Sequence, residues 1–372
     1  MILRPSSAHR WGPGGCPGSP HLEARYPEDT ESPAAREGTA AHYYATERLQ
    51  GRVWPIGTLA PNGHPIDQDM IDGGDLLYET VRAIRAGCSD QARMYVERGV
   101  TMHGLIHPQN EGTLDVAIID FVQHKVFVID YKYGHRYVEV FRNWQLVDYL
   151  AGVIEGAELS REEFIGWSVN AVIVQPRWFG KQGTVRTWST LGHKFWPELE
   201  ALASAAERAA DPAAPLQTGE HCRDCSARHM CPALGAVSGL GIDLAWESSP
   251  AEMSLDAMAR ENRQITWAIE RLEARKTGLD ASLTAALMSG KPVPLWGMTR
   301  TEGRENWRVP VSQVIDLGDM MGVDLRKMGT LTPNQARKAG LDEAVTSQYA
   351  GRNAGEIKLV LLDETTAAKA FS

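Results

Sequence analysis

The chain has 372 residues, of which 43% are hydrophobic, and a formal net charge of −9. This length allows one large domain or two ordinary ones, each with its own core. No stretch approaches the roughly 20 apolar residues that span a bilayer, and the N-terminus, with Arg4, Ser6, Ser7 and His9, lacks the apolar centre of a signal peptide. We therefore expect a cytoplasmic protein. The acidic balance argues against a protein that coats nucleic acid through positive charge alone.

The first 240 residues alternate between helical and extended patterns. Pro, Gly and Ser fill the first 33 positions, apart from a short predicted helix near Leu22. Helical patterns predict four further helices, over residues 34–50, 67–86, 142–154 and 193–210. Runs of β-branched and apolar residues predict four strands, over residues 93–102, 113–122, 125–131 and 168–174. A short polar turn separates the second and third strands, which predicts a hairpin in a mixed α/β domain with a central sheet.

The composition shifts toward Gly and Ser over residues 235–250, which predicts a domain boundary near residue 240, although a long surface loop would look the same. Beyond it we expect helices over residues 254–288, 311–321 and 333–339, and strand-like pieces around Trp296, around Trp307 and over 357–362. Residues 241–372 therefore predict a smaller α+β domain whose role the sequence does not indicate.

The predicted hairpin carries two carboxylates and a lysine. Asp130 and Lys132 lie two residues apart on the third strand, so both side chains leave the same face. Asp115 follows Gly112 at the start of the partner strand, and the hairpin could bring it next to Asp130. Carboxylates hold Mg²⁺ or Mn²⁺, and an ammonium group positions or activates water, so the set suits phosphodiester hydrolysis. Bound cations would also invert the local acidic potential. Asp-x-Lys alone is more typical of a solvated ion pair on an exposed strand edge.

Other polar residues flank this pair in the sequence. Gln145 and Tyr149 stand at i and i+4 of the following helix and therefore share a face. His42 lies within the first long helix. A helix face packed on the sheet and an ordinary hydrogen-bonded histidine are the structural alternatives. Three more carboxylates are weaker candidates: Glu97 and Glu111, which suit surface positions, and Asp120, which sits at the far end of its strand.

The chain has five cysteines, Cys16, Cys88, Cys222, Cys225 and Cys231. An odd number without a secretion signal argues against a disulfide framework. Cys222, Cys225 and Cys231 give three soft ligands within ten residues, and Cys16 is the natural fourth, whereas Cys88 is expected to be an ordinary thiol. Four thiolates hold an iron–sulfur cluster or zinc, and the spacing alone does not distinguish the two. His221 and His229 are possible zinc ligands, so zinc remains an alternative.

The motif order resembles the RecB-like branch of the PD-(D/E)XK nuclease superfamily, which includes the iron–sulfur CRISPR adaptation nucleases. The motifs are His42, Gly112-x-x-Asp115, Asp130-x-Lys132 and Gln145-x-x-x-Tyr149. The resemblance implies a nuclease domain over residues 1–240 with Asp115, Asp130, His42 and the Tyr131 carbonyl as ligands to Mg²⁺ or Mn²⁺. It implies Lys132 as the catalytic lysine, and Gln145 and Tyr149 as residues that orient the site and the DNA strand.

In iron–sulfur members of that branch, one cysteine precedes the histidine helix and three follow the nuclease core. The resemblance therefore implies a 4Fe–4S cluster on Cys16, Cys222, Cys225 and Cys231, with zinc as the less favoured occupant. The layout also resembles an uncharacterised family common in phage and prophage replication regions, through Arg10-Trp11, Glu37-Gly38-Thr39-Ala40-Ala41-His42 and Asp130-Tyr131-Lys132-Tyr133-Gly134. This second resemblance covers nearly the full length and implies a phage setting, hence the host cytoplasm.

We therefore expect a metal-dependent deoxyribonuclease, acting as an exonuclease on single-stranded or end-bearing DNA in phage replication or recombination, with 5′ to 3′ polarity favoured. A structure-selective or nicking endonuclease is an alternative function that would use the same phosphodiester hydrolysis. A catalytically idle DNA-binding recombination accessory protein is the rival of another class. The expected partners are DNA and phage replication or recombination proteins, and the oligomeric state stays open. Arg177 and Trp178, after the fourth strand, could contact a phosphate and stack on a base, although a structural turn explains them equally well.

Overall fold

The structure is a computed structural model that describes residues 3–27, 32–244, 254–307, 309, 311–325 and 332–361. It divides into two compact units, residues 1–276 and 277–372. The division comes later than the boundary predicted near residue 240, because α8 (Pro232–Leu244) occupies most of the expected linker and Ala274 of α9 (Leu255–Met288) packs against Cys222 and Cys231. The rest of that linker, residues 245–250, lies outside the described residues.

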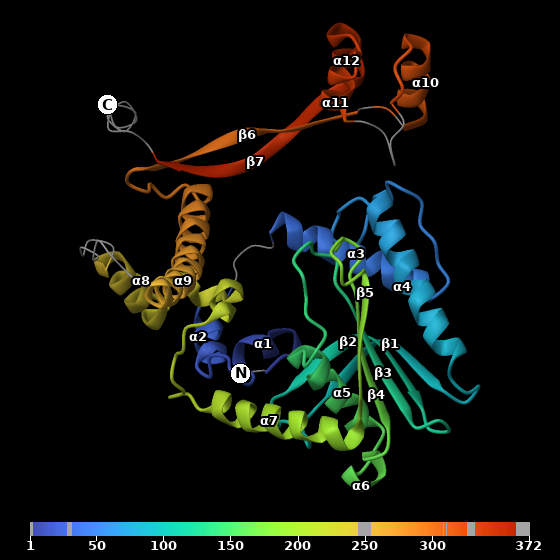
Figure 1. Cartoon of the computed structure of the whole chain (residues 1–372), viewed down its shortest axis with the longest axis vertical. Coiled ribbons are helices and arrows are strands. Elements are labelled where there is room, and N and C mark those ends of the chain that lie inside the picture. The colour runs from blue at the N-terminus through green and yellow to red at the C-terminus, as the bar shows by residue number, and fades with distance from the viewer. Residues whose placement is uncertain are drawn as a thin grey trace. The chain divides into compact units, whose positions relative to one another are not determined.

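A five-stranded mixed sheet forms the centre of the first unit (Figure 1). Its strands, in spatial order, are β1 (Arg93–Thr101), β2 (Glu111–Asp120), β3 (Lys125–Tyr131), β4 (Ser168–Val174) and β5 (Val185–Leu191). The parallel pair is β3 and β4, and the other neighbours are antiparallel. The mixed α/β class and the β2–β3 hairpin are confirmed. The edge strand β5 was not predicted, because its one buried residue, Arg186, is polar and breaks the usual apolar alternation.

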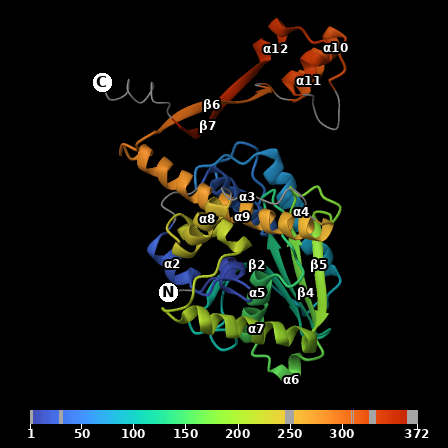
Figure 2. The same ribbon diagram turned by 60° about the vertical axis from the view of Figure 1, so that its left-hand side comes forward.

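Helices cover both faces of this sheet (Figures 1 and 2). On one face, α3 (Pro33–Leu49) and α4 (Gln68–Ala86) pack apolar side chains against the sheet; on the other, α5 (Trp144–Gly156) and α7 (Gly192–Ala210) do so. Local sequence explains two of the helix starts. Ser32 caps α3 by accepting from the Ala35 amide, and Asn143 caps α5 by accepting from the amides of Gln145 and Leu146. The Asn143 cap fixes where α5 begins, and thereby the position of Gln145.

Shorter elements complete the first unit: the helices α1 (Ala8–Trp11), α2 (Ser19–Arg25) and α6 (Arg161–Phe164), and 3₁₀ turns at Pro5–Ser7, Glu220–Asp224 and Ser226–His229. The first residues add to the core under β2, since Leu3 and Trp11 are both buried there. The Leu3 amide donates to the Gln109 carbonyl, and the Glu111 amide donates to the Leu3 carbonyl. The N-terminal segment is therefore part of the domain that carries the site.

In its described residues, the second unit contains the end of α9, an antiparallel pair of strands and three further helices. The strands are β6 (Trp296–Trp307) and β7 (Ala350–Leu361), and the helices are α10 (Val311–Met321), α11 (Pro333–Lys338) and α12 (Glu343–Tyr349). The pieces predicted around Trp296 and Trp307 are the two ends of the single strand β6. A small core joins α10 and α11 through Val314, Leu317 and Ala336. This part of the chain therefore combines helices with an antiparallel strand pair. None of the helices in the described ranges has the length and apolar content needed to cross a membrane.

Candidate functional site

Two carboxylates meet where β2 and β3 run side by side. The ladder pairs Val116 with Ile129, so Asp115 and Asp130 fall at the next step of the same register. Asp115 Oδ2 accepts a hydrogen bond from the Tyr131 amide at 2.7 Å. The hairpin geometry thus places the carboxylates of two separate motifs at one point, with the backbone of Tyr131 between them.

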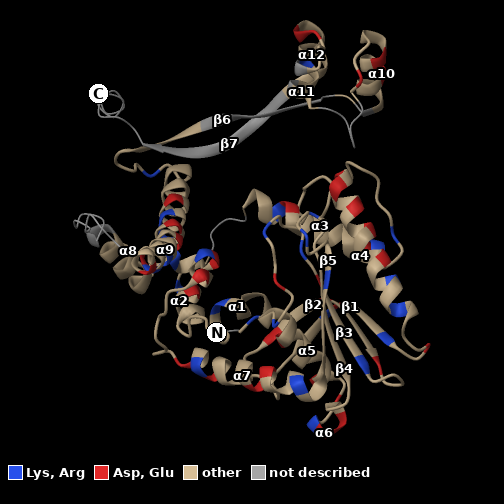
Figure 3. Cartoon of the chain, in the orientation of Figure 1, with Lys and Arg blue, Asp and Glu red and all other residues tan. Residues whose placement is uncertain are grey.

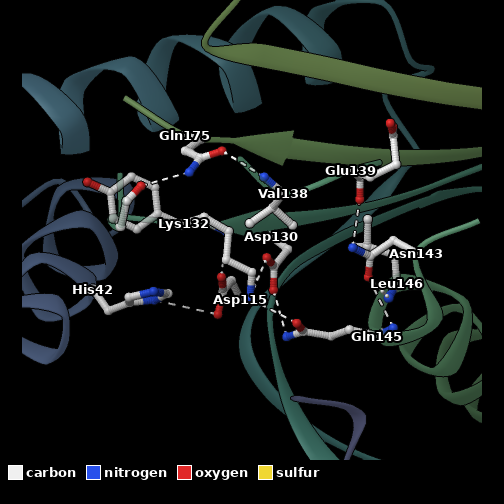
Figure 4. A network of polar contacts seen from close by, with 12 residues as sticks. His42, Asp115, Asp130, Lys132, Val138, Glu139, Asn143, Gln145, Leu146 and Gln175 are labelled. Atoms are coloured by element: carbon white, nitrogen blue, oxygen red, sulfur yellow. Dashed lines mark hydrogen bonds and ion pairs between the residues drawn. The ribbon is translucent and has the colours of Figure 1, made fainter. Parts of the chain in front are cut away.

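Lys132 and Gln145 surround the Asp130 carboxylate (Figure 4). Lys132 Nζ lies 2.9 Å from Asp130 Oδ2, as expected for side chains on the same strand face. Gln145 donates from Nε2 to Asp130 Oδ1 at 2.9 Å and accepts from Lys132 Nζ at 2.8 Å. The three side chains form a closed ring of contacts. Gln145, placed by the start of α5, therefore fixes the ammonium and the carboxylate relative to each other.

His42 approaches Asp115 from α3, which covers the opposite face of the sheet from α5. Its Nδ1 lies 3.8 Å from Asp115 Oδ1, and its ring meets the Tyr131 ring edge-on at 5.1 Å between centroids. Glu97 of β1 completes a group with these two: the ligand atoms of His42, Glu97 and Asp115 all lie within 4.8 Å of one another. In the part of the chain that the structure describes, it is the one such group of three. Imidazole and carboxylate donors could hold a divalent cation here.

Glu97 reaches this group through an unusual backbone conformation. Its φ of 48° lies in the left-handed region, which costs a non-glycine residue free energy and is enriched at functional sites. The Thr46 hydroxyl on α3 donates to Glu97 Oε1 at 3.0 Å. The sequence indicated a surface carboxylate at this position more strongly than a ligand. No sequence signal pointed to its left-handed backbone.

The ionisation of these groups suits cation binding. Burial and the nearby charge of Asp130 raise the pKa of Asp115 well above its usual range. Desolvation and the Lys132 ammonium lower the pKa of His42, so the imidazole is neutral at pH 7 and keeps a lone pair for a ligand bond. A cation bound by Asp115 and His42 would offset the repulsion between the Asp115 and Asp130 carboxylates.

Tyr149 lies beneath the start of β2. Burial and the charges of Asp130 and Asp115 raise the pKa of its phenol, which stays protonated as a hydrogen-bond donor. A Cβ atom at Gly112 would come within 3.3 Å of the Tyr149 ring and 2.8 Å of Pro5 Cδ, so only glycine fits without a shift. This close approach gives a physical reason for the glycine three residues before Asp115.

The weaker carboxylate candidates Glu111 and Asp120 are not part of this group. Glu111 is exposed at the first position of β2. Asp120 is buried at the far end of β2, where it accepts hydrogen bonds from the amide and hydroxyl of Ser89 and from the amides of Val122 and Gln123. Asp120 thus connects the end of α4 to the β2–β3 turn, a structural role.

One neighbour of the site was not predicted. Gln175 follows β4 and is buried beside the segment after Lys132 (Figure 4). Its side-chain amide donates to the carbonyls of Gly134 and Arg136 at 2.7 and 2.6 Å, and its Oε1 accepts from Arg186 at 2.6 Å. It thereby joins the loop after β3 to the loop after β4. A lone glutamine before Pro176 has no motif by which sequence reasoning could have found it.

The four predicted cysteines line one small cavity away from this site: Cys16, Cys222, Cys225 and Cys231. Backbone amides of Gln217, Gly219 and Leu234 point at the Sγ atoms of Cys16, Cys222 and Cys231 at 3.2, 3.3 and 3.4 Å. Burial and nearby Glu23 raise the pKa of Cys225 to about 12, so its thiolate form needs a cation beside it.

The remaining thiol lies away from the cysteine cavity, whereas His221 lines it together with the four cysteines. Cys88 lies after α4 and donates to the Ile84 carbonyl at 3.3 Å, and it is not among the residues that line the cysteine cavity. The His221 and His229 rings lie 3.0 and 3.1 Å from the carbonyls of Gln217 and Ser226. Each histidine therefore has one ring nitrogen occupied by backbone.

A family model described as "Protein of unknown function (DUF2800)" matches residues 1–313. No curated protein matches the chain. The matched range contains both the carboxylate and lysine site and the cysteine cavity, and it extends into the second unit.

Proposed function

Because the chain belongs to the DUF2800 family, whose description assigns no function, we propose from the site itself that it is a metal-dependent DNA nuclease of the PD-(D/E)XK kind. The observation that carries the proposal is the convergence of Asp115, Asp130 and Lys132 with His42 and Gln145 at one point of a mixed sheet. The sheet flanked by helices on both faces supports the same core.

Each residue has a distinct proposed role. Asp115, Asp130, His42 and the Tyr131 carbonyl would hold Mg²⁺ or Mn²⁺, which suits their hard oxygen and neutral imidazole donors, and Glu97 would join them as a further ligand. When bound, such a cation would supply stabilisation of charge on the scissile phosphate and a lowered pKa of water. The Lys132 ammonium orients the attacking water, and Gln145 holds that ammonium against Asp130. Tyr149 supports the strand that carries Asp115.

We propose exonucleolytic action on single-stranded or end-bearing DNA, 5′ to 3′, in phage replication or recombination in the host cytoplasm. A structure-selective or nicking endonuclease would use the same residues. The polarity and the phage setting rest on the resemblance of the motifs, and the chemistry rests on the site. An accessory protein without catalysis would have no chemical need to keep Asp130, Lys132 and Gln145 in a closed ring of contacts.

The test is a cleavage assay on end-labelled linear DNA and on circular single-stranded DNA, with Mg²⁺ or Mn²⁺. We expect linear DNA to be degraded, and Lys132→Ala to slow the reaction by roughly 100-fold or more. Lys125→Ala is the matched control, since Lys125 begins the same strand but bonds Gln123 instead. Undiminished cleavage by the Lys132 variant would contradict the mechanism, and cleavage of the circle would favour the endonuclease.

We also propose that the cysteine cavity holds a 4Fe–4S cluster. Four thiols converge there, and three receive backbone amides, which stabilise negative charge on sulfur. The same four thiols could hold zinc. The resemblance to the iron–sulfur nucleases favours the cluster over zinc.

A further inference from the structure

The loop between β4 and β5, residues 175–184, begins directly beside the proposed catalytic lysine. The Lys132 amide donates to the Val174 carbonyl at 2.8 Å, because β3 and β4 run parallel and end at the same edge of the sheet. Five residues of chain cover at most about 18 Å. Phe179 therefore lies within that distance of the last residue of β4, which is the scale of a few nucleotides of an extended DNA strand.

Both ends of this loop are fixed. Gln175 is tied to Gly134 and Arg136 by its amide, and its backbone amide donates to the Thr184 carbonyl at 2.7 Å. Arg177 pairs with Glu37 at 2.8 Å and lies over the Tyr133 ring. The loop therefore has a defined position beside the site.

Trp178, the aromatic residue that the sequence singled out, is used by the fold itself. Its ring packs on Tyr137 with 5.0 Å between centroids. A Cβ atom at position 180 would lie 2.4 Å from the Trp178 ring, so only glycine allows the chain to turn there. Arg177 and Trp178 thus hold the loop, and the side chain between Trp178 and Gly180 is left to solvent.

That side chain is Phe179, which is 87% exposed, more than any other large hydrophobic residue in the described ranges. An exposed phenyl ring adds nothing to the free energy of folding, whereas a buried one stabilises the folded state or a complex. Lys181, two residues later, is also exposed. Two carboxylates near the loop are occupied: Glu37 pairs with Arg177, and Glu139 accepts from the Tyr137 hydroxyl.

We propose that Phe179 and Lys181 form a stacking tip that binds single-stranded DNA next to the cleavage site, a proposal that rests on the nuclease function above. An aromatic face accepts a base of any sequence, and a neighbouring ammonium accepts the phosphate. The bases of an intact duplex are already stacked, so the ring selects unpaired nucleotides. Acidic and basic residues are interspersed along helices such as α4 and α9 (Figure 3). Such mixed charges attract the DNA backbone only weakly, so a local contact with the bases would add to the affinity.

The test measures binding of the full-length protein to a fluorescent oligothymidine by anisotropy, with Ca²⁺ replacing Mg²⁺ and salt held constant. We expect Phe179→Ala to weaken binding roughly 5- to 150-fold, and Phe179→Trp to keep it. The same oligonucleotide with abasic sites in place of its bases should bind wild type and Phe179→Ala equally. Ile165→Ala is the control, because Ile165 is 52% exposed but precedes β4 at the other edge of the sheet.

The outcomes separate this proposal from the nuclease function. If wild type cleaves DNA but Phe179→Ala binds oligothymidine as tightly as wild type, the stacking tip is wrong and the nuclease stands. An equal loss on the abasic oligonucleotide would also overturn stacking, because no base is present to stack. If wild type neither binds nor cleaves DNA, both proposals fail together.

Discussion

Replacing Asp148 by asparagine should stabilise the protein at neutral pH. Asp148 lies on α5 between Gln145 and Tyr149, has no exposed surface, and accepts from Asn110 Nδ2 at 2.7 Å. Its Oδ2 and the Asn110 Oδ1 are both buried, and neither has a hydrogen-bond partner among the described residues. Burial raises the pKa of Asp148 well above its usual range. One proton on Oδ2 would satisfy both orphaned oxygens, giving a cyclic pair of a carboxylic acid and an amide.

The magnitude follows from this proton. Above a pH of about 4 an unfolded chain ionises Asp148, whereas the folded protein keeps it protonated up to its raised pKa. In that window the folded state binds one more proton than the unfolded state, so stability falls by about 1.4 kcal/mol per pH unit. In the Asp148→Asn variant the new side-chain amide would make the same two hydrogen bonds and would not titrate. The stability of Asp148→Asn relative to wild type should therefore rise by that slope and then level off above the folded pKa.

The assay is urea unfolding of both proteins without divalent cations at four pH values between 4.5 and 7.5. Taking the difference between the two proteins cancels the titration of every other group, including Asp115. Asp148→Ala serves as a comparison; it leaves the Asn110 amide without a partner and should cost roughly 1–3 kcal/mol. A difference between wild type and Asp148→Asn that does not change with pH would refute the protonated pair, and so would an Asp148→Asn variant less stable than wild type throughout.

Three further predictions concern other carboxylates and the thiols. Glu97→Gln should weaken Mn²⁺ binding, measured by calorimetry, by roughly 10- to 100-fold. Glu111→Gln, a change at an exposed position, should leave the affinity unchanged. If both variants weakened Mn²⁺ binding equally, Glu97 would not be a ligand of the cation. Burial opposes ionisation of Asp120, but its hydrogen bonds outweigh this and lower its pKa to about 2. The stabilisation from this carboxylate is thus present above about pH 4 and lost toward pH 2, and the deficit of Asp120→Ala in acid unfolding should shrink over that window; a constant deficit would contradict this. Cys225→Ser should abolish the visible absorbance of anaerobically purified protein and Cys88→Ser should keep it; a colourless wild type containing zinc would overturn the iron–sulfur proposal.

The features that sequence predicted well depend on local periodicity. The spacing of Asp130 and Lys132 on a strand, and of Gln145 and Tyr149 on a helix, is set by backbone geometry within a few residues. The β2–β3 hairpin then brings Asp115 to Asp130 over a separation of only 15 residues. Each step is short-range, so the arrangement of these side chains could be predicted from the sequence.

The features that sequence missed depend on contacts between distant segments. The position of Glu97 requires a left-handed residue in β1 and a hydroxyl from α3, neither of which has a pattern in the sequence. For Arg177 and Trp178 the sequence left DNA contact or a structural turn open; the fold uses both in the turn, and the exposed aromatic residue of the loop is Phe179. The two compact units divide after residue 276, and Ala274 packs with Cys222 and Cys231, a contact between segments far apart in the chain that the sequence did not indicate.

The N-terminal segment links the two proposed sites physically. Cys16 lines the cysteine cavity, and its amide donates to the Arg10 carbonyl at 2.6 Å. A few residues earlier, Pro5 rests against Gly112, three residues before Asp115. A cluster that fixes Cys16 to the loop around Cys225 would thus restrain the same segment that supports the start of β2. We therefore expect such a cluster to support the geometry of the carboxylates, because it would close a loop of about 200 residues and add to the contacts of Leu3 and Trp11 that already hold this segment.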